Sequence, residues 1–329
     1  MRPMRRITTL SDRALDRGLR VGVLALLVAA LAFAGLYYKD QHVSAGPSLL
    51  DRQVSSAEQA VRRAPGSVPA RLALAQAYQS DKRLDDAVEQ YDEILKVNGN
   101  HRAALLGRGR ALMAKGDLDR AAGAFRRIIE VAKPGEFAGS DPQLEAAYYF
   151  LGSIAVAQHK PAAALTQLEA ALRIDPTDSD AWYLVGVATM QVGEPKKAVS
   201  ALERALTFVP TGWCDPYTQL AAAYKALGLE PKAEYAGAMT DFCEKRLDVA
   251  KRRLTALISG PQAVDAMLGL GLMAETAAQP GEAISWYRRI LGRDATNTAA
   301  LAALTRLGVR PATAVKPSPS APTSSRQGA

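Results

Sequence analysis

Residues 145–178 and 179–212 repeat one another with a period of 34 residues. Overlaying the two segments pairs Tyr148 with Trp182, Leu151 with Val185, Gly152 with Gly186, Ala164 with Ala198, Leu168 with Leu202, Ala171 with Ala205 and Pro176 with Pro210. A fixed period of this length indicates one supersecondary unit per repeat, and such units bury a continuous core only by stacking on their neighbours. The repeat therefore predicts a solenoid rather than a set of unrelated globular domains.

Each repeat carries the pattern of two helices. Apolar residues recur three and four positions apart, which predicts one buried stripe on each helix. Gly152 and Ala164 are small at the point where the two helices of a unit cross, since a larger side chain would hold the helices apart. Pro176 ends the second helix, because proline disfavours a helical conformation in the residue before it.

This pattern resembles the tetratricopeptide repeat (TPR), a helix-turn-helix unit, over about residues 48–307. The resemblance implies an all-α fold, a right-handed TPR α-solenoid of about six helix-turn-helix units preceded by a single transmembrane helix. Residues 214–263 fit the repeat less well, because the helix near 231–245 pairs equally well with the helix before it or after it. We expect units near 68–101, 102–135, 145–178, 179–212, 214–247 and 264–297, and an extra helix at 247–258.

The rest of the chain divides by composition. We expect a cytoplasmic basic N-terminus, a transmembrane helix, a linker, the TPR solenoid with half-units at both ends, and a disordered tail rich in proline, serine and alanine. Their bounds are 1–20, 21–38, 39–48, 49–307 and 308–329.

An uncharged run of 18 residues extends from Val21 to Tyr38. As a helix it spans about 27 Å, close to the ~30 Å hydrocarbon core of a membrane. Six arginines precede the run, whereas only Lys39 and Arg52 follow it closely. The positive-inside rule then keeps the N-terminus in the cytoplasm and places the repeats on the extracytoplasmic side. The sequence predicts a single-pass protein of the cell membrane.

Two other interpretations of the apolar run remain open. Ala32-Phe33-Ala34 has the small-x-small form of a signal-peptide cleavage site, so the segment also fits a leader that is removed. A buried helix of a soluble protein is the third interpretation. We favour the retained anchor, because the charged leader is long and the run continues to Tyr38 without a polar break.

The net charge of +8 comes from 41 basic and 33 acidic residues, and the pI is near 9.5. Such a value by itself suggests nucleic acid or an anionic surface as a partner. However, residues 1–20 hold six arginines against two aspartates, and residues 311–329 hold two basic residues and no acid. The repeats are close to neutral, so we expect no nucleic-acid partner.

Catalytic patterns are sparse. His42, His101 and His159 have no ligand spacing between them, and the chain contains no HExxH, Walker or CxxC motif. Gly107-Arg108-Gly109 lies inside a repeat helix rather than after a strand, which excludes a Rossmann loop. We expect no enzymatic activity, no cofactor, no metal and no small-molecule substrate.

The two cysteines, Cys214 and Cys243, are the first and thirtieth residues of the fifth unit. In an antiparallel helix pair, the start of the first helix lies beside the end of the second. An oxidising compartment therefore permits a disulfide there, which stabilises by about 3.6 kcal/mol on chain-entropy grounds. The alternative is that Cys243 is a small core residue. Val97, Val131, Ile174 and Phe208 hold the equivalent place.

The TPR resemblance also implies a binding surface. In this family the first helices line a concave face that holds an extended peptide or a helix of a partner protein. By register, the predicted partner-binding residues are Leu106, Arg110, Met113, Tyr149, Phe150, Ser153, Val156, Tyr183, Leu184, Val187 and Met190. The stripe is mostly apolar and lacks the lysine, arginine and asparagine set of family members that clamp a carboxylate. The alternative is that these residues only pack neighbouring first helices together.

We interpret the chain as a non-catalytic interaction scaffold or assembly factor, anchored in the membrane and binding a protein partner. Similar architectures occur in bacterial envelope-assembly factors. One alternative is therefore a cytochrome c maturation factor that holds apocytochrome. Another is a regulatory subunit of a membrane enzyme complex.

Overall fold

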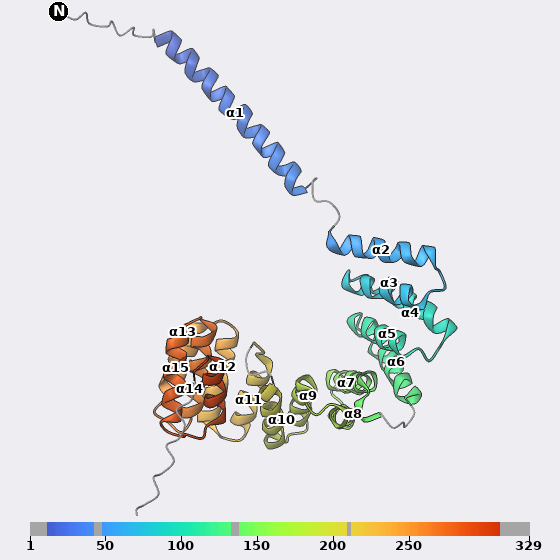
Figure 1. The fold of residues 1–329 in the computed structure, drawn as a ribbon, viewed down its shortest axis with the longest axis vertical. Coiled ribbons are helices and arrows are strands. Elements are labelled where there is room, and N and C mark those ends of the chain that lie inside the picture. The colour runs from blue at the N-terminus through green and yellow to red at the C-terminus, as the bar shows by residue number, and fades with distance from the viewer. Residues whose placement is uncertain (1–11, 43–47, 133–137, 209–211, 310–329) are drawn as a thin grey trace, which may run out of the picture. The chain divides into compact units, whose positions relative to one another are not determined.

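The computed structural model describes residues 12–42, 48–132, 138–208 and 212–309 (Figure 1). Over these ranges the ordered elements are α-helices and one short 3-10 helix, with no strand. The all-α fold predicted from the repeat is therefore confirmed. The predicted N-terminal tail before residue 12, the centre of the linker and the predicted disordered tail from residue 310 lie outside the described residues. The chain divides into two compact units, Met1–Val97 and Asn98–Ala329.

Within the described residues, the first unit holds four helices. Helix α1 is a single apolar helix of 31 residues that extends beyond the predicted span at both ends. After it, α2 packs against α3 and α3 against α4. Ser48 starts α2 with a capping box, because its hydroxyl accepts from the Asp51 amide and the Asp51 carboxylate accepts from the Ser48 amide. The bounds are α1 Asp12–His42, α2 Leu49–Arg63, α3 Val68–Ser80 and α4 Leu84–Val97.

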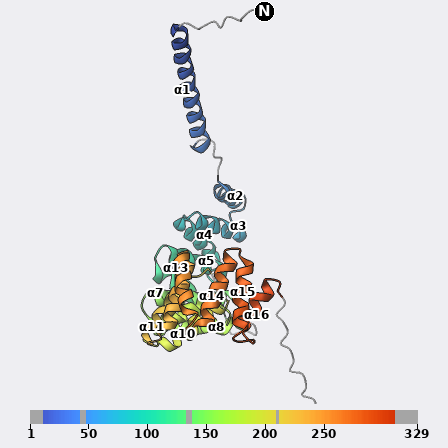
Figure 2. The ribbon, with the colours of Figure 1, turned by 90° about the vertical axis from the view of Figure 1, so that its left-hand side faces the viewer.

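The second unit holds twelve α-helices within the described residues, each packed on the next in the chain. They are α5 Arg102–Ala114, α6 Leu118–Val131, α7 Pro142–Ala157, α8 Pro161–Ile174, α9 Ser179–Gln191, α10 Pro195–Phe208, α11 Asp215–Ala226, α12 Glu230–Cys243, α13 Leu247–Leu257, α14 Ala263–Thr276, α15 Pro280–Leu291 and α16 Thr298–Arg306, with the 3-10 helix η1 Ala138–Ser140 before α7. The first helices also contact one another, α5 with α7, α7 with α9 and α9 with α11. At the C-terminal end, α16 packs on α15 (Figure 2).

The glycines of the repeat explain how closely the two helices of a unit approach. A Cβ on Gly152 would lie 2.5 Å from Cγ of Leu168, and one on Gly186 would lie 2.6 Å from Cγ of Leu202. Leu168 and Leu202 are themselves fully buried. In these two units the second helix therefore places a large side chain where the first helix has none, and close packing requires glycine there.

Helix α12 departs from the alternation of first and second helices. It packs against α11 as a second helix does, and against α13 as a first helix does. It also contacts α14, which is how neighbouring first helices meet elsewhere in this unit. The structure therefore gives α12 both of the pairings that the sequence left open, and Figure 1 shows α12 to α15 gathered together.

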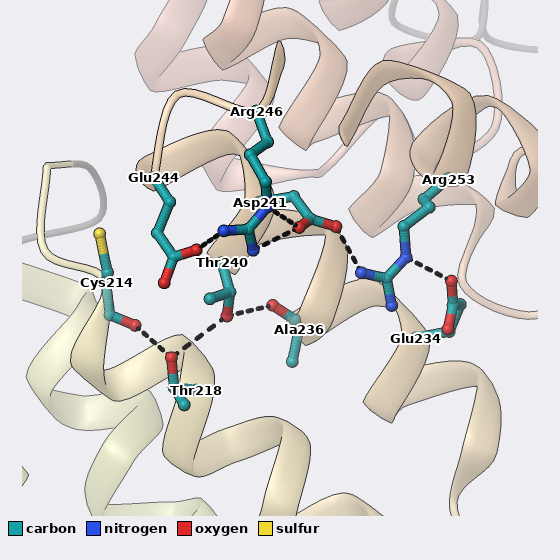
Figure 3. Close-up of polar contacts among 9 residues, drawn as sticks. All are labelled: Cys214, Thr218, Glu234, Ala236, Thr240, Asp241, Glu244, Arg246 and Arg253. Atoms are coloured by element: carbon teal, nitrogen blue, oxygen red, sulfur yellow. Dashed lines mark hydrogen bonds and ion pairs between the residues drawn. The ribbon is translucent and has the colours of Figure 1, made fainter. Parts of the chain in front are cut away.

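An ion-pair network joins α12 to α13. The Asp241 carboxylate, only 6% exposed, accepts from the Arg246 guanidinium at 2.7 Å and also from Arg253 (Figure 3). Arg253 in addition donates to Glu234 at 2.6 Å. A Cβ on Gly237 would lie 2.6 Å from Nη2 of Arg253, so the guanidinium crosses α12 at a residue without a side chain. Arg253 therefore has a structural role in joining α13 to α12.

Candidate protein-binding surface

The eleven predicted partner-binding residues lie on α5, α7 and α9, and all belong to the second unit. We refer to this surface as the first-helix face. Arg110 is exposed and the other ten residues are half-buried. Equivalent positions share one register. Tyr149 and Tyr183 each stand three residues before a packing glycine, and Ser153 and Val187 each follow one directly.

Aromatic rings on this face contact one another. The ring of Phe150 stacks on Phe125 with centroids 5.0 Å apart and meets Tyr149 edge-on at 5.1 Å. The ring centroids of Tyr183 and Trp213 are 5.1 Å apart. Trp213 is not among the residues predicted from helical register. Trp213 was missed because it precedes α11 in a connecting segment, where helical register gives no prediction.

Several of these residues also pack the core. Tyr149, Val156 and Leu184 lie against the buried cluster of Leu168 and Leu172, and Tyr183 lies against the cluster of Leu202 and Leu220. Packing between neighbouring helices therefore accounts for part of each of these four side chains. Their inner atoms hold neighbouring helices together, while their outer atoms remain open to solvent or a partner.

Carboxyl groups gather at the N-terminal ends of α7 and α9, next to Tyr149. Asp178 caps α9, since its Oδ1 accepts from the amides of Asp180 at 2.9 Å and Ala181 at 3.1 Å. Burial raises the pKa of Glu145 to about 7, assisted by a hydrogen bond to Asp178 and by the charges of Asp178 and Asp175. Glu145 therefore keeps its proton to a higher pH than an exposed glutamate does.

Glu145→Gln is expected to stabilise the protein at pH 8 but not at pH 5. The folded state holds the Glu145 proton up to about pH 7, whereas the unfolded chain releases it near the usual value of 4.5. Stability from this group is therefore present below pH ~4.5 and lost as the pH rises through about 7. Thermal unfolding followed by circular dichroism at the two pH values measures the difference.

The matched control for this prediction is Glu230→Gln, an exposed glutamate in the first turn of α12 as Glu145 is in that of α7. Its effect should be the same at both pH values. An equal gain from Glu145→Gln at pH 5 and pH 8 contradicts the raised pKa of Glu145.

The two cysteines meet at one end of the α11–α12 pair. The structure joins Cys214 and Cys243 by a disulfide, with their Cα atoms 5.4 Å apart. Beside it, Thr218 accepts or donates a hydrogen bond with Thr240 at 3.5 Å, which links the same two helices (Figure 3). Val97 holds the position in the first repeat that Cys243 holds in the fifth, and its side chain is 86% exposed. This position is therefore not part of the core in every repeat.

The histidines have structural roles where their side chains are described. His101 caps α5, its Nδ1 accepting from the Ala104 amide at 3.2 Å. His159 occupies a turn with a φ of 53°, the place that Gly193 takes one repeat later. In the described part of the chain, no three His, Cys, Asp or Glu side chains are placed to hold a metal ion.

A family model described as tetratricopeptide repeat matches residues 54–96, 72–137, 149–212 and 245–307, which together span more than half of the chain. The chain belongs to the tetratricopeptide repeat family. The matches cover the expected repeats on both sides of the segment that contains α11 and α12. A comparison of this TPR protein with curated proteins gives no match.

Several solved TPR structures are similar to this TPR protein. MamA 41-end from Desulfovibrio magneticus RS-1 is 21% identical, with 55% of this chain and 97% of that chain covered and a TM-score of 0.48. YrrB, described as a TPR protein with an unusual peptide-binding site, is 18% identical, with coverages of 60% and 97% and a TM-score of 0.47. The Cut9–Hcn1 structure is 17% identical, with coverages of 79% and 46% and a TM-score of 0.47.

Proposed function

We propose that this TPR protein is a non-catalytic scaffold or assembly factor, held at the membrane by α1, which binds a peptide or helix of a partner protein on the first-helix face. The observation that carries the proposal is the half-buried stripe of aromatic and aliphatic side chains along α5, α7 and α9. Apolar surface with aromatic anchors is typical of protein-binding sites. Met113 and Met190 add side chains that adapt to irregular partners.

Membrane anchoring is supported by the surface of α1. The helix has a candidate span of 20 residues, Arg20–Lys39, with a mean hydropathy of 2.2 and none of it buried by the rest of the chain. Large side chains such as Leu26 and Leu31 are more than 70% exposed. An apolar surface of this extent requires a lipid environment or removal with a leader peptide.

Crosslinking from the first-helix face tests the binding proposal. A photoreactive amino acid at Met113 or at Met190 is expected to trap the same partner, identified by mass spectrometry as one protein with one crosslinked segment. The same group at Ala162 or Ser200, exposed on the second helices α8 and α10, should not trap it. Equal yields of that partner from both pairs of positions contradict binding on this face.

A charge-insertion variant provides the quantitative control. Ser153→Glu combined with Val187→Glu should lower the crosslinking yield about ten-fold or more, because two carboxylates are then desolvated against an apolar partner. We prefer these positions to Tyr149 and Tyr183, whose rings also pack the core. Ala162→Glu with Ser200→Glu is the matched pair. Circular dichroism must show unchanged helical content in both pairs.

The mass of the mature chain separates an anchor from a leader. If α1 is retained, the membrane fraction contains the intact chain, and carbonate washing does not release it. Cleavage after Ala34 instead yields a shorter chain that is extracted without detergent. A protease added outside the cytoplasmic membrane should digest the repeats in the first case, with residues 1–20 protected.

A further inference from the structure

A cavity of about 400 Å³ is lined by residues of α10, α11, α12 and α14, none of which is among the eleven residues of the first-helix face. Its volume is within the range of sites that bind small molecules or single side chains. We refer to it as the corner cavity. The residues that give it its chemistry are Glu203, Tyr217, Tyr224, Lys232, Tyr235 and Asp265.

The corner cavity arises from the double role of α12. Leu268 and Leu272 of α14 line it, three residues before and one residue after the packing glycine Gly271. This is the register that Tyr183 and Val187 hold on α9. Because α12 is second helix to α11 and first helix to α13, the first-helix side of α14 and the second helix α10 line the same cavity. A regular repeat would not produce this junction.

The charges in the cavity wall do not balance. Glu203 and Asp265 are carboxylates, and Lys232 is the one ammonium group among the lining residues. The Tyr224 hydroxyl donates to Oε1 of Glu203 at 2.7 Å, and the Lys232 ammonium lies 5.5 Å from the centroid of the Tyr224 ring. Burial raises the pKa of Asp265, Lys232 opposes the shift, and Glu203 adds to it. Two acids facing one base leave room for a second cation.

The aromatic groups suit a cation that is flat and carries several donors. Tyr217, Tyr224 and Tyr235 present rings on α11 and α12, and no hydrogen bond of the Tyr235 hydroxyl is found within the described residues. A guanidinium group stacks on an aromatic face while its N–H groups reach a carboxylate or a hydroxyl. An ammonium ion is more strongly hydrated and lacks the planar fork, so arginine fits this wall better than lysine.

We propose that the corner cavity accepts an arginine side chain of the protein partner, with its guanidinium between the tyrosine rings and Asp265. This contact uses none of the eleven residues of the first-helix face, although Tyr183 of that face packs against the cluster that contains Leu220 and Tyr224. It rests on the proposed function only for the partner's being a protein. The arginine competes with Lys232 for the π face of Tyr224. It also supplies the second positive charge that balances the carboxylates of Glu203 and Asp265.

The test uses the full chain in a non-ionic detergent at low ionic strength. The probes are N-acetyl-arginine-N-methylamide and its citrulline counterpart, which has nearly the same shape and no charge. Saturation-transfer difference NMR measures both dissociation constants. We expect the arginine probe to bind about ten-fold more tightly than the citrulline probe, or more. Equal affinities overturn the proposal.

Two variants separate the cavity from general charge effects. Asp265→Asn should weaken the arginine probe about five-fold or more, whereas Asp119→Asn, which also removes an acid from the first turn of a helix, should not. Lys232→Met should tighten binding about three-fold, because it removes the competing cation. A purely structural lysine would give weaker binding instead, and that result overturns the proposal even where Asp265→Asn fails to fold.

Two further measurements identify the source of the cation and test the corner cavity independently of the first-helix face. If spermidine binds about ten-fold more tightly than the arginine probe, the occupant is a free polyamine and the assignment to a partner side chain is wrong. Ser153→Glu with Val187→Glu should leave the affinity of the arginine probe unchanged. A failure of crosslinking on the first-helix face therefore does not imply a failure of the corner cavity, and the reverse also holds.

Discussion

Replacing Cys214 and Cys243 together by serine is expected to lower the free energy of unfolding of the α11–α12 pair by about 3.6 kcal/mol. The disulfide joins residues 29 positions apart, and the loss follows from the chain entropy that the unfolded segment regains. In a repeat array, unfolding is local, so the effect should concentrate in α11, α12 and their direct neighbours. Hydrogen exchange followed by mass spectrometry resolves it helix by helix.

The reductant provides the control for this prediction. The wild-type chain should lose about the same protection in α11 and α12 when it is reduced, while the double serine variant should not respond. Mobility on a non-reducing gel should shift on reduction for the wild type only. If neither mobility nor exchange of the wild type depends on reductant, the cysteines are not bonded in the purified protein.

Asp241→Ala is expected to destabilise the α12–α13 pair by about 3 kcal/mol. The variant leaves two guanidinium groups, those of Arg246 and Arg253, without the buried carboxylate that they share. A hydrogen bond to a charged group contributes about 1.5–3 kcal/mol. Asp241 accepts from two arginines, and we expect their combined loss to stay near the upper value of one bond because both arginines are partly exposed. Urea unfolding monitored by hydrogen exchange in α12 and α13 measures the loss.

Two comparisons show whether the burial of Asp241 is the cause. Glu244→Ala removes another partner of Arg246, but an exposed one, and should cost less than about 1 kcal/mol. Asp241→Leu with Arg253→Met should recover much of the loss, since an apolar pair replaces a buried charged pair at little cost. Equal losses of stability from Asp241→Ala and Glu244→Ala would show that the burial of Asp241 is not the cause.

The spacing of residues along the chain predicted the helix pairs, because the two helices of a pair are adjacent in sequence and contact each other. Gly152 and Leu168 are 16 residues apart and always meet when one helix folds back on the next. The 34-residue period therefore contained the helix pairs, their packing glycines and the register of the first-helix face. The close approach of Cys214 and Cys243 follows from the same antiparallel pairing, which is why it was foreseen as one of two possibilities.

Contacts between neighbouring repeats were not predictable in this way. The pKa of Glu145 is raised where α7 and α9 bury it next to Asp178, and each residue alone is an ordinary first-turn or capping acid. Trp213 reaches Tyr183 from a connecting segment. Such contacts depend on how far one repeat is rotated against the next, and the residue pattern within a single repeat does not determine that rotation.

The sequence by itself determined that this chain forms stacked helix pairs and carries an apolar segment able to span a membrane, because both follow from periodicity and length along the chain. Only the tertiary structure decided the role of α12. Its small residues Ala233, Ala236 and Ala238 are buried and permit close packing on more than one side, so its pattern fits a first and a second helix equally. The choice depended on which neighbouring faces remained to be covered, and covering both with one helix produced the corner cavity.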